Sequence, residues 1–184
     1  MLLKKLALRL RDHLRHQWKS HLATLALVLA VAWGVNAWQT RHLPGGPAPA
    51  FEAPLVGSLT DTQIELERWR AAYPGRAVAL HFWAEWCPIC RMEEGSITDV
   101  QQDWPVLTVA MRSGDAARVQ RELQQRGLPW LSAVDADGAI AKRYGLASVP
   151  AFVVLDAQGR IRYASVGYTP EWGMRLRLWL AQHV

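Results

Sequence analysis

Both cysteines of the chain lie in one short motif, between an apolar run and the start of a helix pattern. Residues 77–83 read AVALHFW, a run typical of a buried strand. Cys87 and Cys90 follow with two residues between them, and Pro88 suits the first turn of a helix. This junction requires a fold that places a helix N-terminus directly after a buried strand, and it indicates a redox-active dithiol.

The position of each cysteine predicts its role. At a helix N-terminus, unpaired N–H groups and the helix dipole favour the thiolate, so Cys87 is the expected attacking thiol. Cys90, one turn further on, is the expected resolving thiol. A structural disulfide is one alternative, although closing so short a loop gains little. Half of a zinc site is another, for which His81 is the nearby further ligand.

The remainder of the chain alternates between strand and helix patterns. Expected strands cover residues 77–83, 106–111, 130–134, 151–155 and 160–165, and expected helices cover 62–72, 88–102, 115–126, 139–144 and 170–182. Ser113 or Asp115 would cap the third helix, Gly127 would end it, and a hairpin turn would join the last two strands. This order predicts an α/β fold with a mixed central sheet and helices on both faces.

An uncharged segment near the N-terminus predicts a membrane anchor. Residues 20–40 contain no Asp, Glu, Lys or Arg. As a helix rising about 1.5 Å per residue they would extend about 31 Å, the thickness of a bilayer core. A buried soluble helix and a signal peptide cleaved after residues 35–37 are the alternatives.

The charge of the chain is concentrated before this segment. The formal net charge is +5, and residues 1–21 hold one acid, Asp12, and six basic residues: Lys4, Lys5, Arg9, Arg11, Arg15 and Lys19. The positive-inside rule then predicts a cytoplasmic N-terminus and an extracytoplasmic remainder. Residues 1–19 have the pattern of a basic amphipathic helix. Because the rest of the chain is neutral, a nucleic-acid-binding domain is excluded.

The predicted organisation has four parts. Residues 1–19 form the basic segment and residues 20–40 the anchor. Residues 41–50 form a Pro/Gly linker in which nothing is expected to pack. Residues 51–184 form one domain, large enough to bury its own core. His13, His16 and His21 are interpreted as polar-face residues, and no metal site is expected.

Two stretches resemble a known family. FWAEWCPIC, ending at Cys90, resembles the active site of thioredoxin-fold proteins. It is similar to their membrane-anchored periplasmic branch, which includes the thiol reductases of cytochrome c maturation and the suppressor-of-copper-sensitivity D proteins. Residues 141–150, AKRYGLASVP, followed by AFVVLD, resemble the family's second signature. The likeness covers about residues 50–184 and implies a thioredoxin-like domain.

The resemblance also implies roles for individual residues. Pro150 would be a cis-proline facing the cysteine pair, and Val149 would offer its backbone to a bound substrate. The alternative for Pro150 is a trans proline that opens a strand at residue 151. Trp86 is expected either to flank the thiols as a contact surface or to serve in packing, and Pro88 is expected to contribute to the substrate surface. An additional strand and helix would lie within about residues 111–138.

The chain departs from the thioredoxin pattern at His81, where thioredoxin has a buried acid. His81 could transfer protons at the resolving thiol or could be a hydrogen-bonded core residue. Glu85 could shuttle protons or lie solvated at the rim of the site. Glu93 and Glu94 are interpreted as helix stabilisers, since acids favour the first turns of a helix.

These observations predict a thiol-disulfide oxidoreductase that lies in a bacterial periplasm. The predicted enzyme reduces disulfides of other proteins. Its partners would be protein thiols or disulfides, including proteins of cytochrome c maturation or copper stress, and a membrane thiol donor would recharge it. No organic cofactor is implied. A Cu(I)-binding module and an anchored, redox-inert interaction domain are the alternatives; the four methionines, which form no cluster, count against copper.

Overall fold

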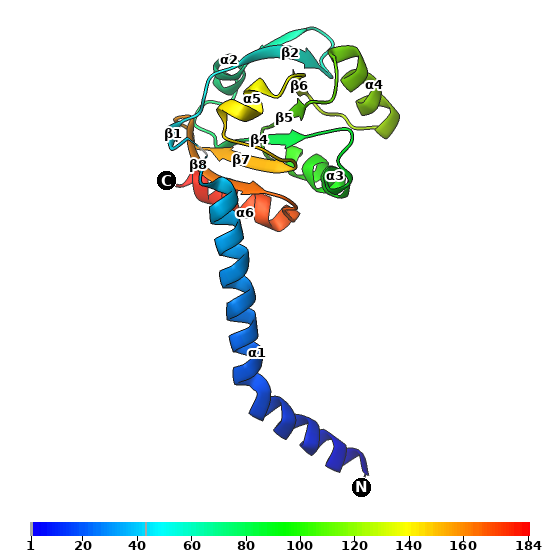
Figure 1. Ribbon diagram of the computed structural model, residues 1–184, viewed down its shortest axis with the longest axis vertical. Coiled ribbons are helices and arrows are strands. Elements are labelled where there is room, and N and C mark those ends of the chain that lie inside the picture. The colour runs from blue at the N-terminus through cyan, green and yellow to red at the C-terminus, as the bar shows by residue number, and fades with distance from the viewer. Residues whose placement is uncertain (1, 43) are drawn as a thin grey trace. The chain divides into compact units, whose positions relative to one another are not determined.

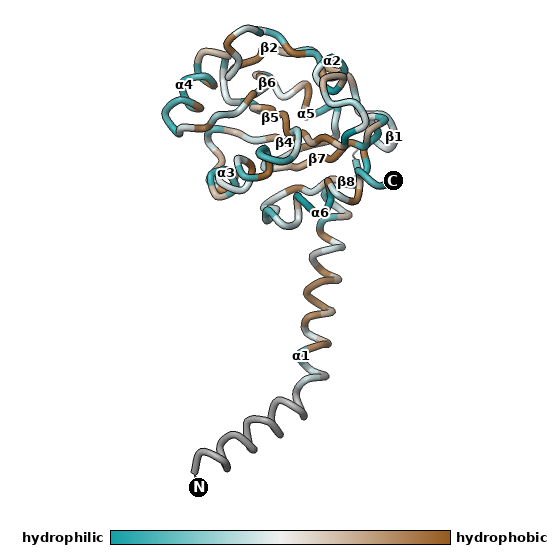
Figure 2. Tube along the Cα trace, turned by 180° about the vertical axis from the view of Figure 1, so that it is seen from behind, coloured by the Kyte–Doolittle hydropathy of each residue, from teal (hydrophilic) through white to brown (hydrophobic). Residues whose placement is uncertain are grey.

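The computed structural model describes residues 2–42 and 44–184, without the side chains of residues 2–17, 19 and 32. The chain divides into two compact units, Met1–Trp38 and Gln39–Val184, each described by itself. Helix α1 (Leu2–Thr40) accounts for the first unit. Its second half, Ser20–Thr40, has a mean hydropathy of 1.5 and is long and apolar enough to cross a membrane (Figure 2). The amphipathic pattern predicted for residues 1–19, with His13 and His16, rests on side chains outside the described ones.

The second unit is built on one mixed sheet (Figure 1). Its strands are β1 (Gly46–Pro47), β2 (Glu52–Val56), β3 (Gln63–Glu65), β4 (Val78–Trp83), β5 (Val106–Met111), β6 (Ser132–Asp135), β7 (Ala151–Leu155) and β8 (Arg160–Val166). The spatial order is β1-β8-β7-β4-β5-β6-β2-β3. Strands β4, β5 and β6 run parallel, and all other neighbours pair antiparallel.

Helices cover both faces of this sheet. The helices are α2 (Leu66–Ala71), α3 (Pro88–Gln101), α4 (Ala116–Arg126), α5 (Ala139–Arg143) and α6 (Glu171–Gln182). Buried side chains of α2 and α5 belong to one hydrophobic cluster, and those of α3, α4 and α6 belong to the other. The predicted α/β class and thioredoxin-like architecture are confirmed, and β6 and α4 supply the additional strand and helix expected between residues 111 and 138.

Strand β4 lies in the middle of the sheet, and all of its side chains are buried. Because side chains alternate along a strand, Leu80 and Phe82 join the cluster on the α2 and α5 face, whereas Ala79 and Trp83 join the cluster on the α3 face. His81 shares the alternation of Ala79 and Trp83. It therefore points towards α3, the helix that begins at the cysteine motif.

The prediction of a helix over residues 62–72 was wrong at its start. Residues Gln63–Glu65 form β3, which pairs with β2 so that Ile64 lies opposite Ala53. The helix begins only at Leu66. Ile64 is buried between two exposed neighbours, so its alternating pattern suits a strand. Pairing with β2, which depends on tertiary contacts, decides between the two structures.

The expectation that nothing in the linker would pack was also wrong. Gly46 and Pro47 pair with Ile161 and Arg160 of β8. The Ala48 N–H then donates to the Gly159 carbonyl oxygen at 2.9 Å. The chain therefore joins the sheet at Gly46, along the edge formed by β8.

Two turn signals act as predicted. Asp115 caps α4, because its carboxylate accepts a hydrogen bond from the Arg118 N–H at 2.8 Å. Gly127 ends the same helix in the left-handed conformation, with φ 63°. Of the two candidate caps, Ser113 and Asp115, the structure therefore selects Asp115.

Strand β2 ends against the loop that precedes β6. Gly57, just after β2, has φ +83°, and a Cβ atom there would collide with the Trp130 carbonyl group. The Gly57 N–H donates to Oε1 of Gln120 on α4 at 2.9 Å. The close approach and the positive φ both require glycine at this position.

Candidate active site

The two cysteines form a disulfide at the N-terminus of α3. Cys87 is the N-cap, Pro88 is the first helical residue, and the two cysteine Cα atoms are 5.3 Å apart. The Cys90 N–H donates to Sγ of Cys87 at 3.1 Å. Cys87 is 4% exposed and Cys90 2%. A helix N–H aimed at Cys87 Sγ stabilises negative charge on that sulfur once the pair is reduced, which suits an attacking thiolate.

The loop before β7 brings a second segment to the disulfide. The Val149–Pro150 peptide bond is cis, as the resemblance implied. The carbonyl oxygen of Val149 lies 3.7 Å from Cys87 Sγ. Antiparallel pairing of β7 with β4 produces this contact, since Ala151 lies opposite Phe82, shortly before the motif.

Helix α4 holds the segment that precedes the cysteines. Nε of Arg118 donates to Oε2 of Glu85 at 2.8 Å, and Arg126 donates to the Glu85 backbone carbonyl, also at 2.8 Å. The Glu85 N–H donates to Oγ of Ser113 at 3.1 Å. The side chain of Glu85 is 11% exposed. Its carboxylate is thus bound to a guanidinium, an arrangement that favours fixing the loop over carrying protons.

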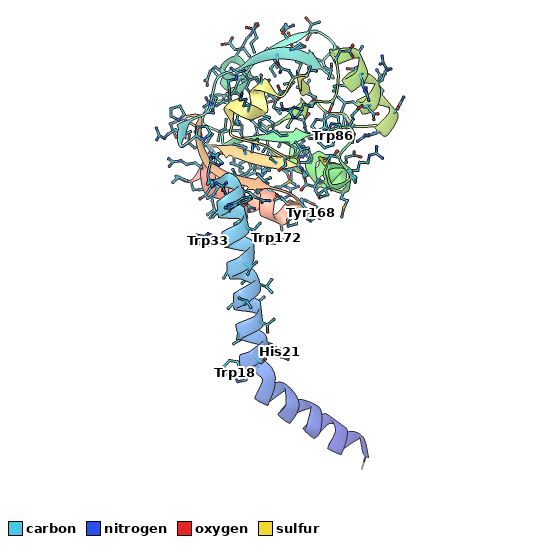
Figure 3. All side chains as sticks on the ribbon, viewed as in Figure 1. Trp18, His21, Trp33, Trp86, Tyr168 and Trp172 are labelled. Carbon is cyan, nitrogen blue, oxygen red and sulfur yellow. A yellow bond between two sulfur atoms is a disulfide. The ribbon has the colours of Figure 1, made fainter. Side chains whose placement is uncertain are left out.

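Trp86 presents an exposed ring beside the disulfide. Its side chain lies near α3 (Figure 3), and the residue is 56% exposed. Its Nε1–H donates to the Arg112 carbonyl oxygen at 3.1 Å. Arg112 itself has φ 49°, a left-handed conformation that is uncommon outside glycine. Ile89 and Met92, also exposed, lie on the first turns of α3 and extend the apolar surface.

A buried histidine and a buried glutamate meet behind the disulfide. His81 is fully buried, Glu93 is 1% exposed, and Nε2 of His81 lies 3.4 Å from Oε2 of Glu93. Neither ring nitrogen of His81 has a hydrogen-bond partner among the described residues. The His81 ring packs edge-on against Trp130, with centroids 5.8 Å apart. Oε1 of Glu93 accepts a hydrogen bond from the Thr169 N–H, in the loop before α6.

Glu93 is the residue whose importance the sequence did not indicate. It follows Cys90 by three positions in α3, so the two side chains lie on the same side of the helix. Its place in the first turns of the helix predicted a helix stabiliser. The structure shows a buried carboxylate instead, and such groups need a compensating partner. The acid three residues after the second cysteine is the signal available in the sequence.

Glu94, by contrast, behaves as a surface residue of the helix. Its carboxylate accepts a hydrogen bond from Arg126 at 2.9 Å and is 22% exposed. Among the residues that the structure describes, no group of three or more His, Cys, Asp or Glu side chains is placed to hold a metal ion.

Comparison with known proteins agrees with this geometry. The Redoxin family model matches residues 43–175, well over half of the chain. Over 147 residues the chain is 31% identical to the thiol:disulfide interchange protein DsbE of Pseudomonas aeruginosa, covering 77% of this chain and 79% of that protein. It is also 31% identical over 104 residues to a thioredoxin-like protein of Haemophilus influenzae, covering 56% of this chain but only 62% of that protein.

Solved structures share the fold. A structure from Chlorobium tepidum, assigned as a thiol:disulfide interchange protein DsbE, superposes with a TM-score of 0.65 at 23% identity. The match covers 76% of this chain and 99% of that one. A secreted thiol-disulfide isomerase of Corynebacterium glutamicum gives 0.63 at 19% identity, covering 74% and 86%. With its helix-capping cysteine pair, its cis-proline and these similarities, the chain belongs to the redoxin family, among the DsbE-like, thioredoxin-like thiol:disulfide oxidoreductases.

Proposed function

We propose that the chain is a membrane-anchored reductant of protein disulfides in the bacterial periplasm. The observation that carries the proposal is the position of Cys87, at a helix N-terminus and 3.7 Å from the Val149 carbonyl oxygen. A thiolate there can attack a substrate disulfide while backbone groups beside Pro150 hold the substrate chain. The relative named as a thiol:disulfide interchange protein supports the same chemistry.

The reaction would proceed in two thiol-disulfide exchanges. In the reduced protein, the Cys87 thiolate attacks one sulfur of the substrate disulfide, forms a mixed disulfide and releases one substrate thiolate. The Cys90 thiolate then attacks Cys87 Sγ and releases the second substrate thiolate. Two electrons pass to the substrate, and the Cys87–Cys90 disulfide seen in the structure is the product.

His81 and Glu93 are proposed to serve the second exchange. Cys90 is buried, so its proton must leave through the protein before the sulfur can attack. Glu93 lies one helical turn away on the same side of α3, and His81 provides a second basic group 3.4 Å from it. Glu85 is the less favoured candidate for proton transfer because Arg118 binds its carboxylate.

The proposed location follows from the N-terminal segment. Helix Ser20–Thr40 is long and apolar enough to cross a membrane, and six basic residues precede it. The positive-inside rule then gives a cytoplasmic N-terminus and a periplasmic redox domain in the inner membrane. Because that compartment is oxidising, a reductant there needs a membrane thiol donor to recharge it.

The direction of electron flow can be tested by the reduction potential of the Cys87–Cys90 pair, measured on the full chain in phospholipid nanodiscs. A value near that of thioredoxin, about −270 mV, is expected of a reductant, whereas one near about −120 mV would mark a disulfide donor. Absence of a reversible couple, together with stoichiometric Cu(I) binding, would replace the proposal by the copper alternative.

A trapping experiment tests the roles of the two thiols. Cys90→Ser leaves the attacking thiol without its partner, so mixed disulfides with substrates should accumulate. Cys87→Ser serves as the matched control and should trap none. Full function in cells with either variant would favour the redox-inert interaction domain.

A further inference from the structure

Helix α6 is apolar on two opposite faces. Its inner face, including Met174, Leu178 and Ala181, is buried against the sheet and α3. Four large apolar residues on the other side are exposed to solvent. They are Trp172, Leu176, Trp179 and Leu180, which are 71%, 48%, 52% and 36% exposed. Spacings of four, three and one residues place them in a single stripe, here called the outer stripe of α6.

The charged groups of α6 lie beside the stripe and already have partners. Arg175 donates to Oε1 of Glu171 at 2.7 Å and also pairs with Asp103. Nη1 of Arg177 donates to the Gly173 carbonyl oxygen at 2.8 Å, and burial lowers the pKa of its guanidinium. Burial of the outer stripe would therefore not remove water from a charged side chain that has no other partner. An apolar surface of this kind marks a site of interaction.

The route of the chain into the domain suggests what covers the stripe. Helix α1 ends at Thr40, and the chain joins the sheet at Gly46, where β1 pairs with β8. Six residues of extended chain reach at most about 20 Å. Helix α6 packs against β7 and β8, the same end of the sheet that receives the incoming chain. The length of this linking chain therefore sets an upper limit on the distance between the C-terminal end of α1 and the edge of the sheet at β8.

We propose that the outer stripe of α6 inserts into the interfacial region of the lipid bilayer that residues 20–40 span. This inference rests on the proposed membrane anchor. Tryptophan is enriched at the level of the lipid headgroups, where its apolar ring and N–H group both find suitable surroundings. A helix that lies in this plane buries its apolar face by about 5–10 Å. Trp172 and Trp179, two turns apart with Leu176 between them, match that geometry.

Such docking would orient the redox site. Helix α3 packs against α6, and the cysteine pair lies at the N-terminus of α3. The Thr169 N–H, one residue before the cap of α6, also binds Glu93. A docked α6 would thus hold the dithiol in a fixed orientation near the lipid surface, accessible to a membrane-embedded thiol donor.

Photo-crosslinking in a bilayer tests the proposal directly. The photoreactive residue p-benzoylphenylalanine is placed at position 172, 176, 27 or 59 of the full chain in phospholipid nanodiscs, and adducts are identified by mass spectrometry. Position 27 lies in the predicted span and reports insertion of the anchor. Leu59 is fully exposed between β2 and β3 and is the matched control. We expect on the order of tenfold more phospholipid adduct at positions 172 and 176 than at 59.

Each outcome has a definite meaning. Lipid adducts at position 27 but not at 172 or 176 would overturn the docking and leave the anchor intact. No lipid adduct at position 27 would overturn the anchor, and the docking with it. Cross-links from position 172 to a second copy or to another protein would overturn lipid as the occupant. Disulfide reductase activity of the same samples tests the proposed chemistry independently.

A second measurement is needed because the photoreactive residue at position 172 or 176 could itself disturb α6. With p-benzoylphenylalanine at position 180, the double substitution Trp172→Gln and Trp179→Gln should reduce the lipid adduct by on the order of tenfold, because two interfacial anchors are lost. Both tryptophans are exposed, so the fold should survive. An unchanged yield would overturn the role of the stripe.

Discussion

Nε2 of His81 and Oε2 of Glu93 lie 3.4 Å apart in the core, between strand β4 and helix α3. Both side chains are inaccessible to water, and neither nitrogen of His81 has a hydrogen-bond partner among the residues described. Because both are buried, these side chains interact with each other and with groups inside the protein rather than with bulk solvent. We propose this pair as the proton acceptor for Cys90, which lies one turn before Glu93 in α3.

Replacing the carboxylate should slow the second exchange. Glu93→Gln keeps the shape of the side chain and removes its ability to take a proton. We expect release of substrate from the mixed disulfide to slow by about 100-fold, the usual contribution of one general base. The measurement is the decay of the mixed disulfide after rapid mixing, followed across a range of pH.

Two further variants separate catalysis from packing. Glu94→Gln, on the same helix but bound to Arg126 near the surface, should leave the decay rate unchanged. His81→Asn should change the pH dependence of the decay as well as its rate. If Glu93→Gln lowered only the unfolding free energy and left the pH profile intact, the proposed proton transfer would be wrong.

Removing the hydrogen bond of the Trp86 side chain should lower the rate of the first thiol-disulfide exchange, in which Cys87 attacks the substrate. Trp86→Phe retains an aromatic ring but loses the bond to the Arg112 carbonyl oxygen. A net loss of about 1 kcal/mol in positioning corresponds to roughly fivefold slower attack on a disulfide-containing peptide. The second-order rate constant of peptide reduction measures it. Trp179→Phe, also exposed but on α6, is the control and should react at the wild-type rate.

The sequence predicts the parts of this site that depend on local chemistry. Cys87, Pro88 and Cys90 begin a helix because a thiol cap and a proline in the first turn favour it there. The cis bond before Pro150 followed from family resemblance, since cis X-Pro bonds are too rare to infer from residues alone. The burial of Glu93 was not predictable, because its partner Thr169 lies 76 residues further along the chain.

The same distinction holds for the fold. The runs that form β4, β5 and β7 are short and mostly apolar, and each contains β-branched or aromatic residues, so their burial was predicted from composition. Strands β1 and β3 are only two and three residues long and form at the ends of the sheet by pairing with β8 and β2. So short a segment carries no periodic pattern, and its structure is decided by its partner strand.

The hairpin between β7 and β8 should lose stability in acid. Asp156 is buried, which by itself opposes ionisation, yet hydrogen bonds from the Arg160 N–H and from Arg162 outweigh this and hold its pKa below the ordinary value. A carboxyl whose pKa is depressed by folding stabilises the protein above the unfolded value of about 3.9 and loses that effect as pH falls through the folded value.

Asp156→Asn should therefore be less stable than wild type at pH 7, by about 1–3 kcal/mol. The difference should persist down to about pH 5 and shrink below about pH 4. Urea unfolding of the full chain in detergent, followed by tryptophan fluorescence, gives both values. Asp61→Asn, at an exposed position, should show no such dependence. A constant difference between pH 7 and pH 3 would contradict the assignment.

The cap of α4 should affect both stability and the active-site loop. Asp115→Ala removes the acceptor for the Arg118 N–H and should cost about 1 kcal/mol of unfolding free energy, whereas Asp115→Asn should retain most of it. Because Arg118 also binds Glu85, the alanine variant should increase amide hydrogen exchange at residues 85–86. Unchanged exchange there would show that Glu85 is held independently of the cap.

The close approach of Gly57 to Trp130 connects a distant part of the chain to the buried His81 and Glu93. The ring of Trp130 packs on both His81 and Trp83, and its Nε1–H donates to Thr98 of α3 at 3.0 Å. A methyl group at position 57 would collide with the backbone carbonyl group of Trp130 and displace that residue. Because the Trp130 side chain is buried, it cannot move without disturbing the side chains packed around it. Adding a single methyl group to this surface turn would therefore displace the Trp130 ring and, through it, the imidazole ring of His81.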